Sequence, residues 1–295
     1  MMNKINRVFL AVSLSVCSVT MAAAQDASGP MKTPKYIQVT VEYTKPGKGG
    51  MAHDKTEGAF VQAMTKAKFP INYFAFNSMS GKPRTIYISG FDSFAEMGKA
   101  EKVFENPGMG ATFEPLNVAD GDLLEDSKQV IFSFDNELSL RPGPDLVHMR
   151  FLEADIIHVK EGHIKEFREL AKMWVDLFGK AGTAMHWDCF QAQYGEEAGY
   201  FIALTDDKSL DDLDAETADG NKFNSMLTDE QKKKMRELRE VAIDEDRTEL
   251  YSLNPTQSYV PDSFIKADPG FWKPKSGGTA KAAAKPVADD KKAKP

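Results

Sequence analysis

The clearest pattern of apolar and polar positions lies in the second half of the chain. Residues 152–158 alternate as in a β-strand, Gly162 interrupts the alternation, and apolar residues then recur at helical spacing between Ile164 and Leu177. Two further strands are predicted at 185–193 and 200–204, and a turn joins them at 195–197. A helical region starts near Ser209, a capping box at Thr228–Gln231 opens a helix to about Ala242, and a last strand covers 248–253.

The first half of the chain shows the same order of elements. The predicted elements are a strand at 36–44, a helix at 51–67, strands at 71–77 and 84–90, helices at 92–104 and around 120–128, and a strand at 129–140. Residues 106–110, Asn-Pro-Gly-Met-Gly, are predicted to form a loop near the end of the sheet.

Three blocks of similar sequence connect the halves. The segment VTVEYTKPGKGG (39–50) resembles ADIIHVKEGHIK (154–165), and TIYISGFDSFAEM (85–97) resembles YFIALTDDKSLDDL (200–213). DNELSLRPG (135–143) resembles RTELYSLNP (247–255). The blocks occur in one order at nearly constant spacing, which indicates an internal duplication.

The order βαββαβ in each half predicts an α+β fold of two tandem ferredoxin-like repeats, at 35–143 and 146–257. Each repeat has an antiparallel sheet with helices on one face, and the other face must be covered. The two sheets are therefore expected to pack face to face as an intramolecular α/β-barrel, and a monomer is sufficient. Residues 258–272 form a C-terminal extension.

The turns KPGKGG and VKEGHIKEF, each leading from a strand into an amphipathic helix, resemble those of the dimeric α/β-barrel superfamily. This superfamily includes antibiotic-biosynthesis monooxygenase-like and NIPSNAP-like proteins. The resemblance covers both repeats and implies the barrel fold. It does not select a function, because the superfamily includes cofactor-free oxygenases, haem-handling enzymes, isomerases, decarboxylases and members without known activity.

The N-terminus is typical of a signal peptide. Lys4 and Arg7 precede an apolar segment at 8–21, and Ala22–Ala24 supply the small residues of a cleavage site. Residues 1–24 are therefore expected to be removed, leaving no transmembrane anchor and a periplasmic or secreted protein. An uncleaved transmembrane anchor and a lipoprotein processed at Cys17 are the alternatives. Once Cys17 is removed, Cys189 has no partner for an intramolecular disulfide.

The C-terminal segment 273–295 contains seven lysines, two aspartates and no large apolar residue beyond Val287. Such a composition predicts a disordered tail. The whole chain nevertheless has a net charge of −7, so the region between the ends is strongly acidic. This charge distribution argues against a nucleic-acid-binding core.

Alternation along the strands divides the unusual residues between two faces. In the first strand of each repeat, we expect an apolar set to face the helices: Ile37, Val39, Val41 and Tyr43, with Leu152, Ala154, Ile156 and His158. The polar set is expected inside the barrel: Gln38, Thr40 and Glu42, with Glu153, Asp155 and Ile157. In the second strand, Trp187 and Cys189 are expected to face the helices, and His186, Asp188 and Phe190 to face inward.

This assignment predicts one asymmetric site inside the barrel. The ligand-binding candidates are Glu153, Asp155, His186 and Asp188 in the second repeat, with Gln38, Asn72 and Phe74 in the first. His186, Asp188, Glu153 and Asp155 could also hold a divalent metal or form an acid–base site, although no established metal-ligand spacing is present. Alternatively, these residues form a polar, hydrated face of the sheet that binds no ligand.

Other candidate residues carry weaker signals. The superfamily resemblance implies that a histidine could hold haem, and His158 and His163 flank the Gly162 turn. Cys189 has no activating base on its own face of the strand, which favours a buried core thiol. The sequence lacks the Walker, dinucleotide-binding, hydrolase-elbow and paired CxxC motifs.

Three functions remain open from the sequence. The leading hypothesis is binding of a small aromatic or lipid-like ligand in the cavity between the repeats. An oxygenase-like enzyme of the barrel class and an envelope interaction module are the alternatives. Whether the protein is an enzyme, and which cofactor it uses, stay undetermined.

Overall fold

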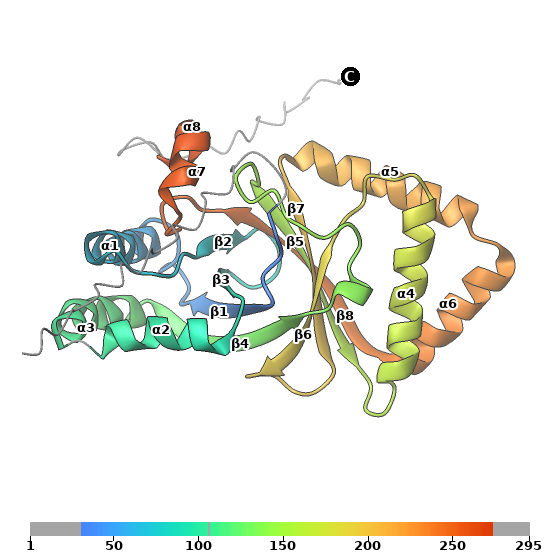
Figure 1. Ribbon diagram of the computed structural model, residues 1–295, viewed down its shortest axis with the longest axis horizontal. Coiled ribbons are helices and arrows are strands. Elements are labelled where there is room, and N and C mark those ends of the chain that lie inside the picture. The colour runs from blue at the N-terminus through green and yellow to red at the C-terminus, as the bar shows by residue number, and fades with distance from the viewer. Residues whose placement is uncertain (1–30, 106, 274–295) are drawn as a thin grey trace, which may run out of the picture.

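The computed structural model describes residues 31–105 and 107–273, and Figure 1 shows their arrangement. The predicted signal peptide at 1–24 lies outside these residues, as does nearly all of the predicted tail at 273–295. Within the described part, no helix is both long enough and apolar enough to span a membrane.

Two units of the same element order follow each other along the chain. The first consists of β1 (Tyr36–Thr44), α1 (Met51–Ala67), β2 (Phe74–Ser78), β3 (Arg84–Phe91), α2 (Phe94–Phe104), α3 (Pro107–Gly121) and β4 (Leu124–Phe134). After a short 3₁₀ helix, Asn136–Leu138, the second consists of β5 (Phe151–Val159), α4 (Ile164–Lys180), β6 (Asp188–Tyr194), β7 (Tyr200–Asp207), α5 (Leu210–Met226), α6 (Asp229–Ala242) and β8 (Ile243–Leu253). The chain then forms α7 (Asp262–Ala267) and α8 (Pro269–Trp272).

The eight strands form one closed antiparallel barrel in the order β1-β3-β2-β8-β5-β7-β6-β4. The units join where β2 pairs with β8 and where β4 pairs with β6. In Figure 1, the helices of the first unit lie outside one half of the barrel and α4 and α6 lie outside the other. The α+β fold and the intramolecular barrel predicted from the sequence are confirmed.

Local sequence signals account for the ends of several elements. Gly47 and Gly162 occupy the matched turns before α1 and α4, and both have positive φ angles, 76° and 83°, which favour glycine. The capping box at the start of α6 is present, because Thr228 and Gln231 bond to each other's backbone. The prediction of a loop at 106–110 is wrong, because α3 begins at Pro107. Proline is well tolerated in the first turn of a helix.

The face assignment of β1 and β5 is reversed in the structure. Ile37, Val39, Leu152 and Ala154 are buried inside the barrel, in one cluster with side chains from the other strands. The polar set, including Gln38, Thr40 and Glu42, instead faces the helices. The interior of the barrel is lined by apolar residues that pack together, and the prediction of a polar interior was wrong.

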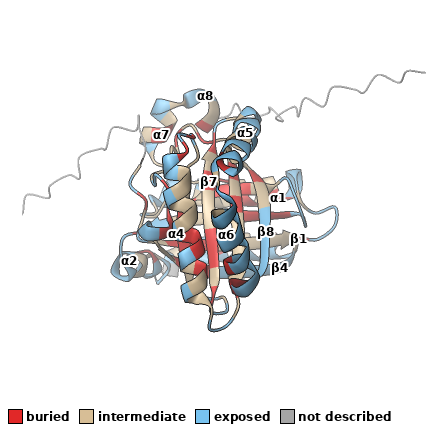
Figure 2. Cartoon of the chain, turned by 90° about the vertical axis from the view of Figure 1, so that its right-hand side faces the viewer, coloured by how far each residue is buried: buried red, intermediate tan, exposed pale blue. Residues whose placement is uncertain are grey.

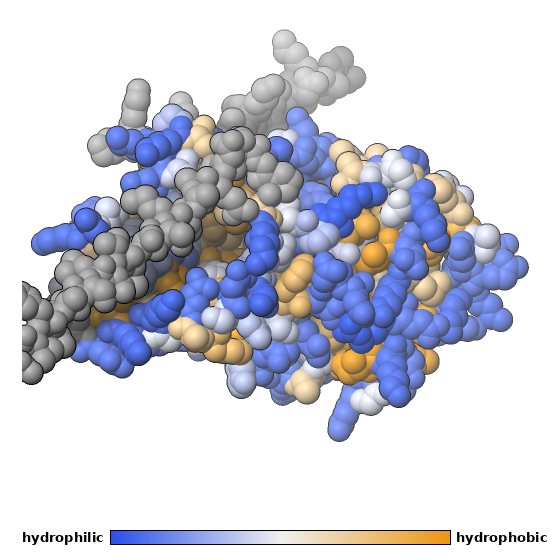
Figure 3. Space-filling model, in the orientation of Figure 1, coloured by the Kyte–Doolittle hydropathy of each residue, from blue (hydrophilic) through white to orange (hydrophobic). Residues whose placement is uncertain are grey.

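The second-strand assignment agrees with the structure. Cys189 is buried in the core between the second sheet and its helices, and Trp187 packs against that core. Phe190 lies inside the barrel. Figure 2 shows α4 and α6 in front of buried strand residues on this side. In Figure 3, hydrophobic side chains are visible between the strands and α4 on an otherwise largely hydrophilic face.

The C-terminal extension crosses back to the first unit. Tyr259 forms an isolated antiparallel bridge with Tyr73. Phe264 and Trp272 are buried beside Phe74 at one end of the barrel, and the Trp272 indole N–H donates to the Val147 carbonyl at 2.9 Å. This segment therefore forms a wall over one mouth of the barrel.

Candidate functional site

A cavity of about 340 Å³ lies at the barrel mouth beneath the C-terminal extension, and we call it the mouth cavity. Apolar residues from both units form its walls, and α7 contributes Phe264. The principal apolar lining residues are Ile37, Phe74, Phe76, Ile88, Leu146, Met149, Leu152, Phe190 and Leu204. Its volume falls at the lower end of the range for small-molecule sites.

The mouth cavity does not extend through the barrel. Phe76 and Phe190 are almost fully buried, with 1 % and 2 % of their surfaces exposed, and they pack across the interior. A much smaller cavity, about 110 Å³, has walls that include Arg84 and Tyr251. Among the described residues, the middle of the barrel is thus a packed core, and the mouth near α7 leaves more space.

Asp188 is the buried acidic group of the mouth cavity. Its side chain accepts a hydrogen bond from the Thr33 hydroxyl, 3.1 Å from each carboxylate oxygen, and another from the Gly143 amide at 3.2 Å. Only 6 % of Asp188 is exposed. This burial raises the pKa of Asp188 to about 6, in spite of the two hydrogen bonds that favour the charged form.

His186 and Asp206 form a second polar pair near the mouth cavity. The imidazole Nε2 lies 3.1 Å from an Asp206 carboxylate oxygen, and Asp206 itself lines the cavity. The hydrogen bond to Asp206 raises the pKa of His186. The pair can therefore place a protonated imidazole near Asp188 as the pH falls.

Three of the seven ligand-binding candidates from the sequence line the mouth cavity: Asn72, Phe74 and Asp188. Asn72 also donates to the Tyr259 carbonyl at 3.1 Å, and Phe74 contacts Phe264 with ring centroids 5.7 Å apart. Gln38 lines a different cavity, outside the barrel on the helix side of the first unit.

Glu153 and Asp155 also lie outside the barrel, which contradicts their predicted position beside His186 and Asp188. They line a cavity of about 320 Å³ between the second sheet and α4 and α6, together with Trp174. Burial, together with the nearby Asp155 and Asp207 carboxyl groups, raises the pKa of Glu153 to about 7. Asp155 accepts a hydrogen bond from the Thr248 hydroxyl.

The metal site proposed from the sequence is therefore not assembled. Among the described residues, none of the four candidates, His186, Asp188, Glu153 or Asp155, belongs to a group of three or more metal-ligating side chains. The first-strand residues were placed on the wrong face, so two carboxylates that were expected inside the barrel lie on its outer surface.

The other singled-out residues have structural partners. His158 stacks on Tyr200 at 4.4 Å between ring centroids and lies 3.1 Å from an Asp244 carboxylate oxygen. His163 Nδ1 lies 3.6 Å from a Glu166 carboxylate oxygen. Burial raises the pKa of the Cys189 thiol, which makes the reactive thiolate harder to form.

Comparison with known proteins finds similarity in structure and none in sequence. No protein-family model matches the sequence, and no curated protein sequence matches it. An anthrone oxidase-like protein is 13% identical, with 80% of this chain and 97% of that chain covered and a TM-score of 0.47. A proposed monooxygenase from Fusobacterium nucleatum subsp. nucleatum is 12% identical, with coverages of 76% and 94% and a TM-score of 0.47.

A mutant chlorite dismutase from Candidatus Nitrospira defluvii is 6% identical, with coverages of 80% and 96% and a TM-score of 0.47. The class of this protein is defined by its own topology. Two ferredoxin-like units whose sheets join into one closed eight-stranded barrel make a dimeric α/β-barrel fold within a single chain.

Proposed function

We propose that the protein binds a small, mainly apolar ligand, aromatic or lipid-like, in the mouth cavity between the two units. The observation that supports this function is a cavity of about 340 Å³ with mainly apolar walls that include the buried carboxyl group of Asp188. Apolar walls supply most of the affinity in such sites, and a few fixed polar groups set the orientation.

Asp188 defines the polar end of the ligand. An ionised carboxylate accepts hydrogen bonds at about four lone-pair positions, and Thr33 and Gly143 donate only from one hydroxyl and one amide. Asp188 therefore retains capacity for a hydroxyl or amino group of the ligand. Such a charge-assisted hydrogen bond contributes roughly 1.5–3 kcal/mol.

The experiment compares two probes of the same shape, 1-naphthol and naphthalene, by ligand-observed NMR on the purified chain. We expect both to bind and 1-naphthol to bind more tightly. Leu146 lines the mouth cavity, so Leu146→Trp should fill it and abolish binding of both probes. Leu210→Trp, at an exposed position on α5, is the matched control and should bind as the wild type does.

Binding that survives Leu146→Trp unchanged would show that the probes occupy another place and would refute the proposal. Failure of the wild type to bind either probe would also count against it. Circular dichroism of each variant establishes that a loss of binding is not a loss of fold.

We further propose that this binding takes place outside the cytoplasm, in the periplasm or after secretion. The support is the signal-peptide pattern at 1–24. Fractionation of the native host, with sequencing of the mature N-terminus, tests it, since a cytoplasmic chain that retains Met1 contradicts export. The oxygenase-like and interaction-module hypotheses stay predictions from the sequence.

A further inference from the structure

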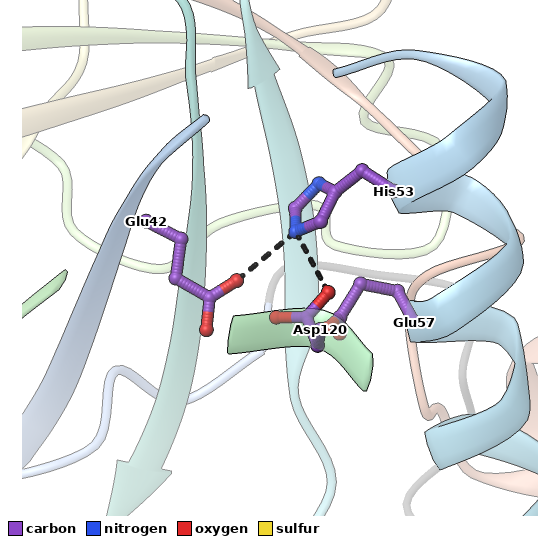
Figure 4. Close-up of side chains that lie close together, drawn as sticks. All are labelled: Glu42, His53, Glu57 and Asp120. Carbon is purple, nitrogen blue, oxygen red and sulfur yellow. Dashed lines mark hydrogen bonds and ion pairs between the residues drawn. The ribbon is translucent and has the colours of Figure 1, made fainter. Parts of the chain in front are cut away.

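Four metal-ligating side chains meet on the outer side of the first sheet, far from the walls of the mouth cavity, and we call them the His53 cluster. Glu42 projects from β1, His53 and Glu57 from α1, and Asp120 from α3 (Figure 4). One ligand atom from each lies within 4.8 Å of the others. His53 Nε2 lies 3.2 Å from a Glu42 oxygen and 3.5 Å from an Asp120 oxygen.

Neighbouring hydroxyl groups hold these side chains in place. The Thr56 hydroxyl donates to Asp120 at 2.6 Å, and Thr85 Oγ1 lies 3.4 Å from the other imidazole nitrogen of His53. Thr85 in turn donates to the Asn77 side chain at 2.8 Å. Partners of this kind orient the ligands of metal sites and fix the imidazole tautomer.

The His53 cluster is buried and contains more carboxyl groups than cationic partners. His53, Glu57 and Asp120 expose 2 %, 6 % and 5 % of their surfaces. In the described part of the chain, no lysine or arginine forms an ion pair with any of the three carboxyl groups. Buried carboxylates are unstable without a counter-charge, which a cation can supply.

The Tyr87 hydroxyl lies at the edge of the His53 cluster and is incompletely satisfied there. Tyr87 is 9 % exposed, and its hydroxyl interacts with Glu57 without making a hydrogen bond of standard geometry among the described residues. Buried hydroxyl groups nearly always make a well-formed hydrogen bond, so this one has room for a further polar partner.

The second unit shows that the fold does not need this cluster. β1 and β5 are both nine residues long, and α1 and α4 are both seventeen, so Glu42 corresponds to Ile157 and Glu57 to Leu170. Leu170 is fully buried in an apolar core against which Ile157 packs. At these two positions the second unit has hydrocarbon where the first has carboxyl groups, whereas His53 corresponds to another ionisable residue, Glu166.

We propose that Glu42, His53, Glu57 and Asp120 bind one divalent transition-metal ion of the Mn²⁺, Fe²⁺ or Zn²⁺ class. Three carboxylates and one imidazole form a donor set that suits these ions. Ligand atoms about 2.1 Å from an ion lie at most about 4.2 Å apart, so small side-chain rotations complete the shell.

The space beside the His53 cluster allows a further ligand to reach the ion. A cavity of about 550 Å³ includes Glu42, Glu57 and Asp120 among its lining residues. Gln38, Thr40 and further polar side chains share the wall with aromatic residues of the helices. The ion is therefore expected to take water or an oxygen-bearing small molecule as an additional ligand.

Titration of the full-length, chelator-treated protein with Mn²⁺ tests the proposal, with electron paramagnetic resonance reporting the free ion. We expect one Mn²⁺ per chain and, with Co²⁺ as a second probe, visible absorption bands from the bound ion. His53→Gln and Asp120→Asn should each weaken binding at least tenfold. Glu153→Gln is the matched control, because it removes a partly buried carboxyl group from the second unit.

The wild-type titration decides the matter even if the variants do not fold. No binding of Mn²⁺ or Co²⁺ by the folded wild type overturns the proposal. Binding that is equally tight in the wild type and in folded His53→Gln and Asp120→Asn also overturns it. The mouth cavity is tested separately with the naphthol probes, so neither result depends on the other.

Discussion

Replacement of Glu57 by glutamine should stabilise the metal-free protein, and by more at high pH. Burial, together with the nearby Glu42 and Asp120 carboxyl groups, raises the pKa of Glu57 to about 9. The unfolded chain releases this proton near pH 4.5, whereas the folded chain holds it until about pH 9. Between these values the folded state binds one more proton, so a rise in pH destabilises the wild type.

The size of the effect follows from the length of that interval. One pKa unit corresponds to about 1.4 kcal/mol, so between pH 5 and pH 7.5 the wild type should lose about 3 kcal/mol through Glu57 alone. Glutamine does not ionise, so this loss is missing in Glu57→Gln. Titrating groups that do not interact with Glu57 are shared, and their contributions cancel in the difference between the two proteins. Glu42 and Asp120 interact with Glu57, so about 3 kcal/mol is the order of magnitude of that difference.

Urea unfolding at pH 5 and pH 7.5, with a chelator present, measures the difference. The advantage of Glu57→Gln over the wild type should grow by about 3 kcal/mol between the two pH values. Glu101→Gln, at an exposed position of α2, controls for the loss of one carboxyl group. An advantage of Glu57→Gln that is the same at both pH values refutes the reasoning.

Three further predictions concern the barrel itself. Asp188→Asn should weaken 1-naphthol binding about tenfold at pH 7.5 and leave naphthalene binding unchanged, because only the hydroxyl probe uses the charged acceptor; an equal loss for both probes contradicts this. Phe264→Ala should cost about 3–5 kcal/mol in urea unfolding through a cavity in a buried wall, and a cost below about 1 kcal/mol is inconsistent with that packing. Arg84→Met should cost about 1–3 kcal/mol because it removes one charged partner of Glu249, which keeps Arg247 and Tyr251, and Glu249→Gln in the same chain should restore part of the loss.

The order of helices and strands could largely be predicted from the sequence, because local sequence patterns determine it. Strand alternation, the helical stripe of α4 and the glycine turns act over a few residues, and the structure confirms them. The helix expected around 120–128 was misplaced, because α3 covers Pro107–Gly121 and β4 already begins at Leu124. The helix starts inside the segment predicted as a loop, where proline fits the first turn.

The face of each strand depends on the rest of the molecule. Alternation shows that Glu42 and Val41 point in opposite directions, but not which one enters the barrel. The expectation was that helices cover apolar residues, whereas α1 presents His53 and Glu57 to the sheet. In the second strand, Trp187 and Cys189 were placed correctly because the large aromatic matches Tyr73 in the other repeat.

The His53 cluster had a partial signal in the sequence. His53 and Glu57 are four residues apart, so they share one face of α1. Glu42 had been assigned to the barrel interior, and Asp120 is contributed by a helix more than sixty residues further along. The convergence of the four side chains requires β1, α1 and α3 to pack together, which no local pattern specifies.

The pairing of β2 with β8 and of β4 with β6 affects how the chain folds during synthesis. When only the first unit has been synthesised, β2 and β4 are both edge strands with unpaired amide and carbonyl groups. β6 covers one edge later, and the other stays open until β8, the last strand, is complete. A fragment ending at residue 143 would keep both edges exposed. We expect two copies of it to pair through β2 and β4, so that the second copy takes the place of the second unit.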